Sequence, residues 1–362
     1  MSAAADFYSQ TRSARRVLVI DPGALGDAVH LVPALWALRA NYPSAELHLV
    51  SSPVGAEIHH LTGCLDRQWV LEQARERRSL VAQLRVLLAL RRLRFDVSIN
   101  FGDQDRNVIH AGIVRARHRL GCRAQRWHFW SRWCIRDWFN RRDPKLPEYE
   151  QRRQLLAAGG MNLESSPRWD LHVPETARRQ AVTLVPEGAI HFSICASSPL
   201  KEWPLENWIA FAKRLLALHP QLQIVATGSR HSREEAQLRS LVAAVASNNL
   251  KPLNGLSIAE LAAVLQRCQL HVGADSGVLH LAAALGRPTI SLFRDYHDAS
   301  AWMPMGAKHR VFSVPCVCVN RREPPCATAN RAACLARLEV EPVATAVGEL
   351  LQSPAPGVPR PQ

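Results

Sequence analysis

Residues 270–288 (LHVGADSGVLHLAAALGRP) constrain the fold of this chain more than any other stretch. Leu270 to Val272 is a short apolar run, which predicts a buried strand, and a polar, glycine-bounded turn follows it. From Val278 onward apolar residues recur at helical spacing until Gly286 ends the pattern. A strand, a tight turn and a helix in this order direct free backbone N–H groups towards an anion. The stretch therefore predicts an α/β protein with an anion site at this turn.

The turn itself supplies four candidate ligand-binding residues. Ser276 and Gly277 lie in the predicted first helical turn, where the amides have no partner within the helix and the macrodipole is positive. Gly277 has no Cβ, so a phosphate could approach it closely. His280, about one turn further on, could face the same ligand. The alternative interpretation is that Asp275 and Ser276 only cap a helix.

The same order of elements recurs in both halves of the chain. A chain of 362 residues suits two domains rather than one core. We expect two doubly wound, Rossmann-like domains over residues 1–172 and 188–362, joined by a linker between Ser165 and Glu187. The predicted strands are Val17 to Ile20, Glu46 to Ser51, Asp96 to Phe101, His191 to Ala196, Gln223 to Thr227 and Thr289 to Phe293.

The glycine-rich turn after the first predicted strand is not a dinucleotide site. Its spacing is Gly23-x-x-Gly26 rather than G-x-G-x-x-G. The second strand ends in Ser51-Ser52-Pro53, which offers no acidic residue for a ribose diol. The sequence therefore disfavours a dehydrogenase.

Positive charge is concentrated in one segment of the first half. The net charge is +14, and residues 75–153 hold 20 Lys or Arg against 8 Asp or Glu. Within this segment, Trp127 to Arg142 (WHFWSRWCIRDWFNRR) interleaves four of the ten tryptophans with arginines. This pattern predicts a basic, aromatic helix suited to a membrane interface. Packing of the rings into the core is an equally good interpretation, whereas nucleic acid binding is disfavoured because no recognition module accompanies the charge.

The compartment can be predicted from what the sequence lacks. No run of eighteen apolar residues is present, and the first residues show no signal-peptide pattern. Nine cysteines in such a chain favour a reducing compartment, so we expect the cytoplasm.

Cys316, Cys318, Cys326 and Cys334 could hold zinc or iron, but they lack a C-x-x-C pair. Reduced, partly buried thiols are the favoured interpretation.

Three motifs in order carry a family resemblance. Residues 271–288 resemble the donor-diphosphate motif of glycosyltransferase family 9, the ADP-heptose:lipopolysaccharide heptosyltransferases. DPGALGDAVHLVPAL (Asp21 to Leu35) resembles the acceptor loop and first helix of that family. SSPLKEWPLENW (Ser197 to Trp208) resembles its lysine-containing segment. The resemblance runs from about Val17 to about Leu351.

The resemblance implies a GT-B architecture, in which two Rossmann-like domains face a cleft. It implies transfer of heptose from ADP-heptose to the lipopolysaccharide inner core, with inversion at the anomeric carbon and without a metal or other cofactor. The first domain would bind the acceptor and the second the nucleotide sugar. Alternatives are another nucleotide sugar, a protein acceptor, or a non-catalytic protein that binds a membrane surface.

The resemblance also assigns roles to residues and partners. Asp27 of the Gly26-Asp27 pair matches the catalytic base, although it could instead only stabilise the start of a helix. We expect a monomer that is peripheral on the anionic inner face of the cytoplasmic membrane and binds no nucleic acid. The expected donor-binding residues are Lys201, Glu234 (with Glu235 possible), Asp275, Ser276, Gly277 and His280, and the expected acceptor-binding residues are Gly26, Asp103 and Arg106.

Overall fold

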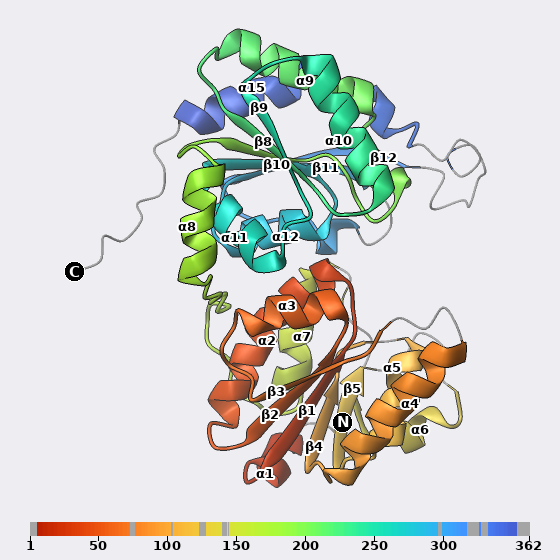
Figure 1. The fold of residues 1–362 in the computed structure, drawn as a ribbon. Helices are drawn as coiled ribbons and strands as arrows, with labels where there is room; N and C mark the ends of the chain where they lie inside the picture. The colour runs from red at the N-terminus through yellow and green to blue at the C-terminus, as the bar shows by residue number, and fades with distance from the viewer. Residues whose placement is uncertain are drawn as a thin grey trace. The chain divides into compact units, whose positions relative to one another are not determined.

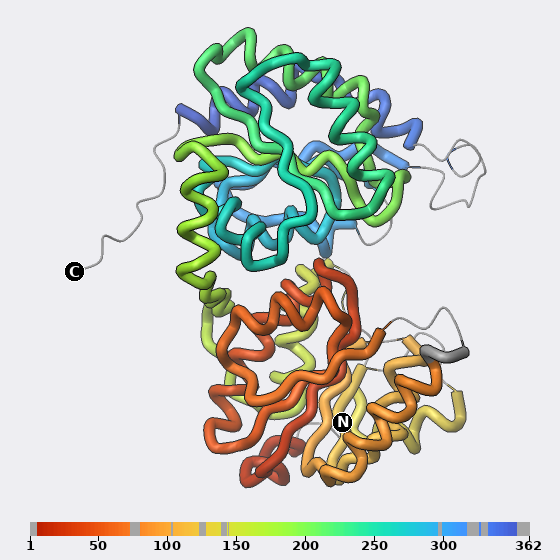
Figure 2. The backbone as a smooth tube through the Cα atoms, viewed as in Figure 1, coloured from red at the N-terminus to blue at the C-terminus, as the bar shows by residue number. Residues whose placement is uncertain are grey.

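A computed structural model describes residues 6–72, 77–102, 104–122, 128–139, 143, 145–295, 299–316, 326 and 332–352. The chain forms two compact units, Met1–His172 and Val173–Gln362. Figure 2 follows the backbone through the first unit, in red to yellow-green, and through the second, in green to blue.

The amino-terminal unit is built on a six-stranded parallel sheet with the strand order β3-β2-β1-β4-β5-β6. This is the doubly wound Rossmann order, in which the chain reverses direction across the sheet between β1 and β4. The strands are β1 (Arg16–Asp21), β2 (Glu46–Ser51), β3 (Arg67–Val70), β4 (Val97–Asn100), β5 (His118–Cys122) and β6 (Asp137–Phe139).

Helices cover both faces of this sheet (Figure 1). Successive side chains of β1 point to opposite faces, so apolar side chains on each face pack against helices. Val17 and Val19 pack with Leu35 of α2, whereas Leu18 and Ile20 belong to a second cluster with residues of α4 and α5. The helices are α1 (Phe7–Thr11), α2 (Leu25–Asn41), α3 (Pro53–His60), α4 (Arg77–Arg92), α5 (Asp105–Val114), α6 (Ser131–Cys134) and α7 (Glu148–Ala158).

The carboxy-terminal unit repeats the same topology. Its parallel sheet has the order β12-β11-β10-β7-β8-β9, which places the reversal between β7 and β10. The expected α/β class with two Rossmann-like sheets is therefore confirmed. The strands are β7 (Ile190–Ser193), β8 (Ile224–Gly228), β9 (Leu250–Asn254), β10 (Leu270–Ala274), β11 (Thr289–Asp295) and β12 (His309–Pro315).

An aromatic cluster fills one side of the second sheet. Phe192 of β7 packs against Trp208 and Phe211 of α9, and Trp203 contacts both of these rings. α9 contacts α10 and α15, while α11 contacts α8 and α12 (Figure 1). The helices are α8 (Glu175–Leu184), α9 (Leu205–Leu218), α10 (Ser232–Val245), α11 (Ile258–Arg267), α12 (Gly277–Ala284) and α15 (Val340–Gln352), with 3-10 turns η1 (Pro199–Lys201), η2 (Ala299–Ala301) and η3 (Leu335–Arg337).

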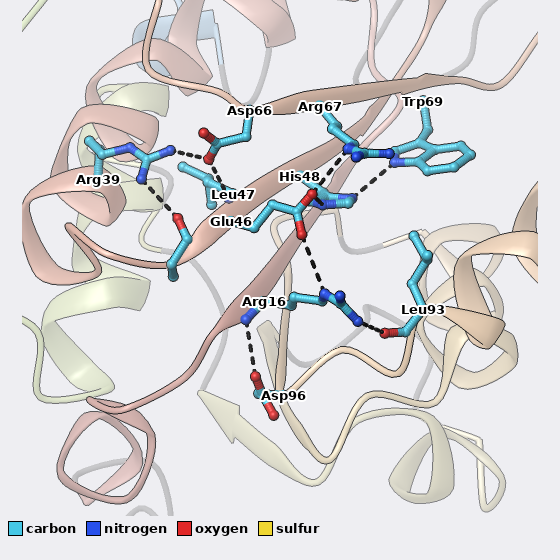
Figure 3. A network of polar contacts seen from close by, with 11 residues as sticks. Arg16, Arg39, Glu46, Leu47, His48, Asp66, Arg67, Trp69, Leu93 and Asp96 are labelled. Carbon is cyan, nitrogen blue, oxygen red and sulfur yellow. Dashed lines mark hydrogen bonds and ion pairs between the residues drawn. The ribbon is translucent and has the colours of Figure 1, made fainter.

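Ion pairs bind the amino ends of the first three strands together (Figure 3). Glu46 of β2 pairs with Arg16 of β1 and Arg67 of β3 at 3.3 and 3.0 Å. Its Oε1 also lies 3.1 Å from Nε2 of the buried His48. The backbone N–H of Arg16 donates to Asp96 just before β4. These contacts lie at the amino ends of the strands, whereas Asp27 follows the carboxyl end of β1. Their role is therefore to hold the strands in register.

Two segments differ from the sequence predictions. The expected linker contains helix α8, because Ala177 and Ala181 are buried and the helix packs against α11. The expected long helix from Trp127 to Arg142 is wrong for its described part, where a four-residue α6 is followed by β6. Pairing of β6 with β5 overrides the helical pattern. Among the described helices, none is long and apolar enough to cross a membrane.

Candidate active site

Both units place their candidate residues at the reversal point of the sheet. In the amino-terminal unit, the loop after β1 leads to Asp27 and the loop after β4 leads to Arg106. In the carboxy-terminal unit, the loop after β7 carries Lys201 and the turn after β10 carries Asp275. Ligands of open α/β sheets bind beyond the carboxyl ends of the strands at such points.

Asp27 has both carboxylate oxygens directed by neighbouring groups. It lies in the first turn of α2, where its Oδ2 accepts the backbone N–H of Ala24 at 3.0 Å. Its Oδ1 lies 3.4 Å from Nη2 of Arg152. The side chain is 34% exposed, so it remains open to a ligand. A carboxylate has about four acceptor positions, and therefore Asp27 can still accept a hydroxyl proton.

Arg152 of α7 joins three carboxylates. It is only 2% exposed, and besides Asp27 it binds Asp21 at 3.3 Å and Glu148 at 2.6 Å. Burial lowers the pKa of Arg152, but the charges of Glu148, Asp21 and Asp27 outweigh it, so the pKa is raised above its ordinary value. A buried cation with this many partners stays charged. Arg152 thus fixes the orientation of Asp27.

The loop before Asp27 is held by close packing. A Cβ on Gly23 would lie 2.4 Å from Cβ of Asp27, so only glycine fits there. The hydroxyl of Ser52 donates to the carbonyl of Gly23 at 2.6 Å. Of the expected acceptor residues, Gly26 lies in the same first turn and Arg106 is exposed on α5. Asp103 lies outside the described residues.

Lys201 and Asp275 meet across the reversal point of the second sheet. The Nζ of Lys201 lies 2.8 Å from Oδ2 of Asp275, which is 5% exposed. Because an ammonium has three N–H donors, two remain for a ligand. Asp275 thereby fixes the lysine beside the amino-terminal end of α12.

The start of α12 has the donors that the sequence analysis expects. Ser276 is extended (φ −143°), and its buried Oγ has no hydrogen-bond partner among the described residues. Gly277 is the first helical residue, so its N–H points out of the helix. His280 is buried, with Nε2 4.0 Å from Oδ1 of Asp275 and its ring against Trp302. His280 therefore lies where it can orient Asp275.

A second ion pair links the Lys201 loop to α10. Glu202 accepts both the backbone N–H of Ala196 at 2.8 Å and Nη1 of Arg233 at 2.7 Å. Next to Arg233, the carboxylate of Glu234 accepts the N–H of Ser229 at 2.8 Å. Glu234, in the first turn of α10, is thus fixed against the loop after β8. In the described part of the chain, Glu235 bonds to this loop through its backbone N–H, which donates to the carbonyl of His231, and not through its carboxylate.

Buried polar side chains cross the second sheet in register. His191 of β7, His271 of β10, Thr289 of β11 and His309 of β12 are directly paired neighbours. The Nδ1 atoms of His191 and His271 lie 2.8 Å apart. Burial lowers the pKa of His191 to about 3, and burial also lowers that of His271. Both rings are therefore neutral, one donating to the other, directly before the turn that carries Asp275.

The cysteine cluster is described in part. Cys316, Cys326 and Cys334 are buried, whereas Cys318 lies outside the described residues. Burial and the neighbouring Cys316 raise the pKa of Cys334 to about 11, so it is a protonated thiol. Within the described ranges, no three His, Cys, Asp or Glu side chains are grouped as metal ligands.

Sequence reasoning missed Arg152, Asp21 and the Glu202–Arg233 pair. The spacing of Glu148 and Arg152 is typical of a helical ion pair, and this signal was available. The spacing of Glu148 and Arg152 gives no indication, however, that this ion pair is buried beside Asp27.

The fold is a two-unit, GT-B-like α/β scaffold with a parallel six-stranded sheet in each unit. The family model of glycosyltransferase family 9 (heptosyltransferase) matches residues 83–331. The chain therefore belongs to glycosyltransferase family 9, as the three motifs suggest, and it is a glycosyltransferase.

Relatives and solved structures agree with this assignment. The lipopolysaccharide core heptosyltransferase OpsX of Haemophilus influenzae is 20% identical over 311 residues, covering 84% of this chain and 86% of that protein. Lipopolysaccharide heptosyltransferase 1 of Pseudomonas aeruginosa is 25% identical over 300 residues, covering 77% of this chain and 78% of that protein. The structure of ADP-heptose lipopolysaccharide heptosyltransferase II of E. coli has a TM-score of 0.74 at 20% identity, covering 93% of this chain and 98% of that one.

Proposed function

We propose that this glycosyltransferase moves heptose from ADP-heptose to a sugar of the lipopolysaccharide inner core, with inversion at the anomeric carbon. The observation that carries the proposal is Asp27, oriented by Arg152 and the Ala24 amide at the reversal point of the first sheet. Support for the substrates comes from the family and from the relatives, whose names give ADP-heptose and the lipopolysaccharide core.

In the proposed reaction, an acceptor hydroxyl attacks the anomeric carbon. Asp27 takes the hydroxyl proton as the new C–O bond forms. The bond from the anomeric carbon to the phosphate oxygen breaks, and ADP leaves with the electron pair. The hydroxyl and the leaving group are on opposite sides of the carbon, so the configuration is inverted.

Departure of ADP requires positive charge at the diphosphate. We assign this role to Lys201, the hydroxyl of Ser276 and the free N–H groups at the start of α12. Asp275 and His280 would hold the lysine in place, and Glu234 would bind the ribose hydroxyls of the donor. This set supplies the charge from the protein, so the proposed reaction proceeds without a divalent metal.

The setting of the reaction is part of the proposal. We infer a monomer that works at the inner face of the cytoplasmic membrane, because a lipid-linked acceptor is presented there. The amino-terminal unit would bind this acceptor through Gly26, Asp103 and Arg106. The carboxy-terminal unit would bind the nucleotide sugar.

The direct test is ADP release from ADP-heptose with and without a lipid A–Kdo acceptor, in the presence of EDTA. We expect acceptor-dependent release that Asp27→Asn lowers by about a hundredfold or more, the usual contribution of a general base. Calorimetric titration should show that the variant binds ADP like the wild type. Near wild-type turnover by Asp27→Asn would remove this residue from the mechanism. Faster turnover of another nucleotide sugar would show that the donor is wrong.

A further inference from the structure

Helix α4 presents a row of apolar side chains to solvent. Leu80, Leu84 and Leu88 are spaced four residues apart, so they lie on one side of the helix, with Val81 beside them. They are 56%, 45%, 41% and 52% exposed, respectively. An adjoining side of the helix, with Leu87 and Leu90, is buried in the core of the amino-terminal unit. The helix therefore has an apolar side that the core does not use.

Arginines border this row. Arg92 continues the spacing of the leucines, and Arg85 and Arg91 are also exposed. Among the described residues, none of the three has a carboxylate partner. This differs from the exposed arginines of α8, Arg178 and Arg179, which both pair with Glu175. Arginines without a carboxylate partner in the described ranges, beside an apolar row, suit a ligand that is both apolar and anionic.

The neighbouring helices also expose apolar side chains. α5 contacts both α4 and α6 (Figure 1), and Ile109 on α5 is 44% exposed. Phe129 and Trp133, at and just before α6, are 76% and 68% exposed and contact each other edge to face. Of the eleven large hydrophobic side chains that the described residues expose, seven belong to this group of helices. Such clustering marks an interaction surface rather than scattered exposure.

The tryptophan segment divides between core and surface. Trp130 and Trp138 are packed against Val108 and Ile135. Only Trp133 is strongly exposed among its described tryptophans. This segment, whose sequence suits a membrane interface and core packing equally well, thus exposes Phe129 and Trp133, whereas α4 supplies the longer apolar row.

We propose that the α4 face, made of Leu80, Val81, Leu84, Leu88, Arg85, Arg91 and Arg92, docks on an anionic lipid surface with Phe129 and Trp133 beside it. An interfacial helix needs apolar side chains for the acyl boundary and basic ones for the headgroups, and α4 has both. A second copy fits less well, because a symmetric contact would bring the unpaired arginines together. Nucleic acid would leave the leucines in water. The inference rests on the proposed function only in that a lipid-linked acceptor gives docking a purpose.

The test is sedimentation of the full-length protein with vesicles, without donor or acceptor. Vesicles contain phosphatidylcholine alone or with about one third phosphatidylglycerol, at low and high salt. We expect binding to the anionic vesicles at low salt and release at high salt, because the attraction fades within a Debye length of about 10 Å at 0.1 M salt. Changing Arg85, Arg91 and Arg92 to Gln should weaken binding by on the order of a hundredfold, at about fivefold per arginine.

Matched control variants distinguish an effect of the α4 face from a general effect of lower net charge or lower surface hydrophobicity. Arg178, Arg179 and Arg239 are exposed in the other unit, and changing them to Gln alters the net charge equally. Leu84→Gln with Leu88→Gln should weaken vesicle binding at least about tenfold. The control pair Val182→Gln and Leu218→Gln, 58% and 44% exposed, should not.

Three outcomes would overturn the proposal. The first is that the wild type does not bind anionic vesicles, and the second is that the control variants lose as much vesicle binding as the α4 variants. The third is that Leu84→Gln/Leu88→Gln changes the oligomeric mass and leaves vesicle binding unchanged. The last result would identify a self-association face. Turnover of a water-soluble, delipidated acceptor is measured in parallel. If heptosyl transfer fails while vesicle binding follows α4, the proposed function is wrong and the docking surface stands.

Discussion

Arg152 controls the charge balance around the proposed base. One buried guanidinium is shared by the carboxylates of Asp21, Asp27 and Glu148. The nearby His59 adds no second positive charge, because burial, and then the charge of Arg152, lower its pKa to about 3. Arg152 is therefore the residue on which both the stability of the cluster and the orientation of Asp27 depend.

Replacing Arg152 should separate these two effects. Arg152→Met removes the buried guanidinium that Asp21 and Glu148 share, which should lower the free energy of unfolding by about 3–5 kcal/mol. Arg152→Lys keeps a positive charge but cannot span three carboxylates, so it should fold and show a lower kcat with an unchanged affinity for ADP. Urea unfolding and steady-state kinetics measure both. Wild-type stability of Arg152→Met would contradict the role given to this cluster.

Lys201 is the corresponding residue of the carboxy-terminal unit. Lys201→Ala should weaken ADP binding by roughly 1.5–3 kcal/mol, because it removes a charge-assisted contact to the diphosphate. The same change leaves Asp275 buried without its partner at 2.8 Å. Calorimetric titration with ADP is the measurement.

The double variant Lys201→Ala/Asp275→Asn serves as the control for Lys201→Ala. It also removes the buried carboxylate charge that the ammonium of Lys201 faces in the wild type, so it should recover stability without recovering ADP affinity. If Lys201→Ala binds ADP as tightly as the wild type, Lys201 is not part of the diphosphate site.

The start of α2 depends on the packing of the loop before it. Gly23→Ala would place a Cβ 2.4 Å from that of Asp27, so the loop or the first helical turn must move. A displacement of about 1 Å at a reacting group can cost about a hundredfold in rate, so we expect a loss in kcat of that order. Gly348→Ala on α15 is the control, because no heavy atom lies within 4 Å of the added Cβ. Equal kcat in both variants would show that this loop does not position Asp27.

Sequence predicts the central elements well because their signals are local. Glu46 to Ser51 is predicted and observed with the same bounds, and the apolar run at Leu270 begins β10. The apolar runs before Asp27 and Lys201 place these residues just after central strands. Such strands are buried on both faces, so their sequence is continuously apolar.

The missed elements depend on tertiary contacts. β6 is a three-residue edge strand that exists through pairing with β5, and its sequence reads as an aromatic helix. The sequence pattern predicts a short helix from Gln154 to Gly160, but α7 begins six residues earlier, at Glu148, because its polar first turns are buried around Arg152. The pairing of Arg152 with Asp27 joins residues 125 positions apart. No periodicity or short motif reports a contact at that separation.

At the scale of the whole molecule, the chain uses one topology twice. Each unit has the same strand order and collects its candidate residues at the reversal point, Asp27 in the first and Lys201 with Asp275 in the second. The proposed proton acceptor and the proposed diphosphate site are therefore held by separate cores.

Buried neutral histidines should make the stability of the molecule sensitive to acid. The pKa of His59 and that of His191 are each lowered from 6.5 to about 3, with burial as the main cause. Below pH 6.5 the unfolded chain binds protons that the folded chain does not. Stability from these residues is thus complete above pH 6.5 and is lost as the pH falls towards 3. The slope approaches about 1.4 kcal/mol per pH unit for each histidine.

His59 offers the cleanest test, because neither ring nitrogen has a hydrogen-bond partner among the described residues. His59→Leu removes the titrating group without removing a hydrogen bond. Between pH 7.5 and pH 5.5, the free energy of unfolding of His59→Leu should therefore fall by about 1 kcal/mol less than that of the wild type. Urea unfolding at both pH values measures the two changes. The neighbouring His60 is exposed, so its ring is solvated in both states and His60→Leu should leave the dependence in place. If the two variants lose stability equally on acidification, the acid sensitivity does not arise from the buried ring.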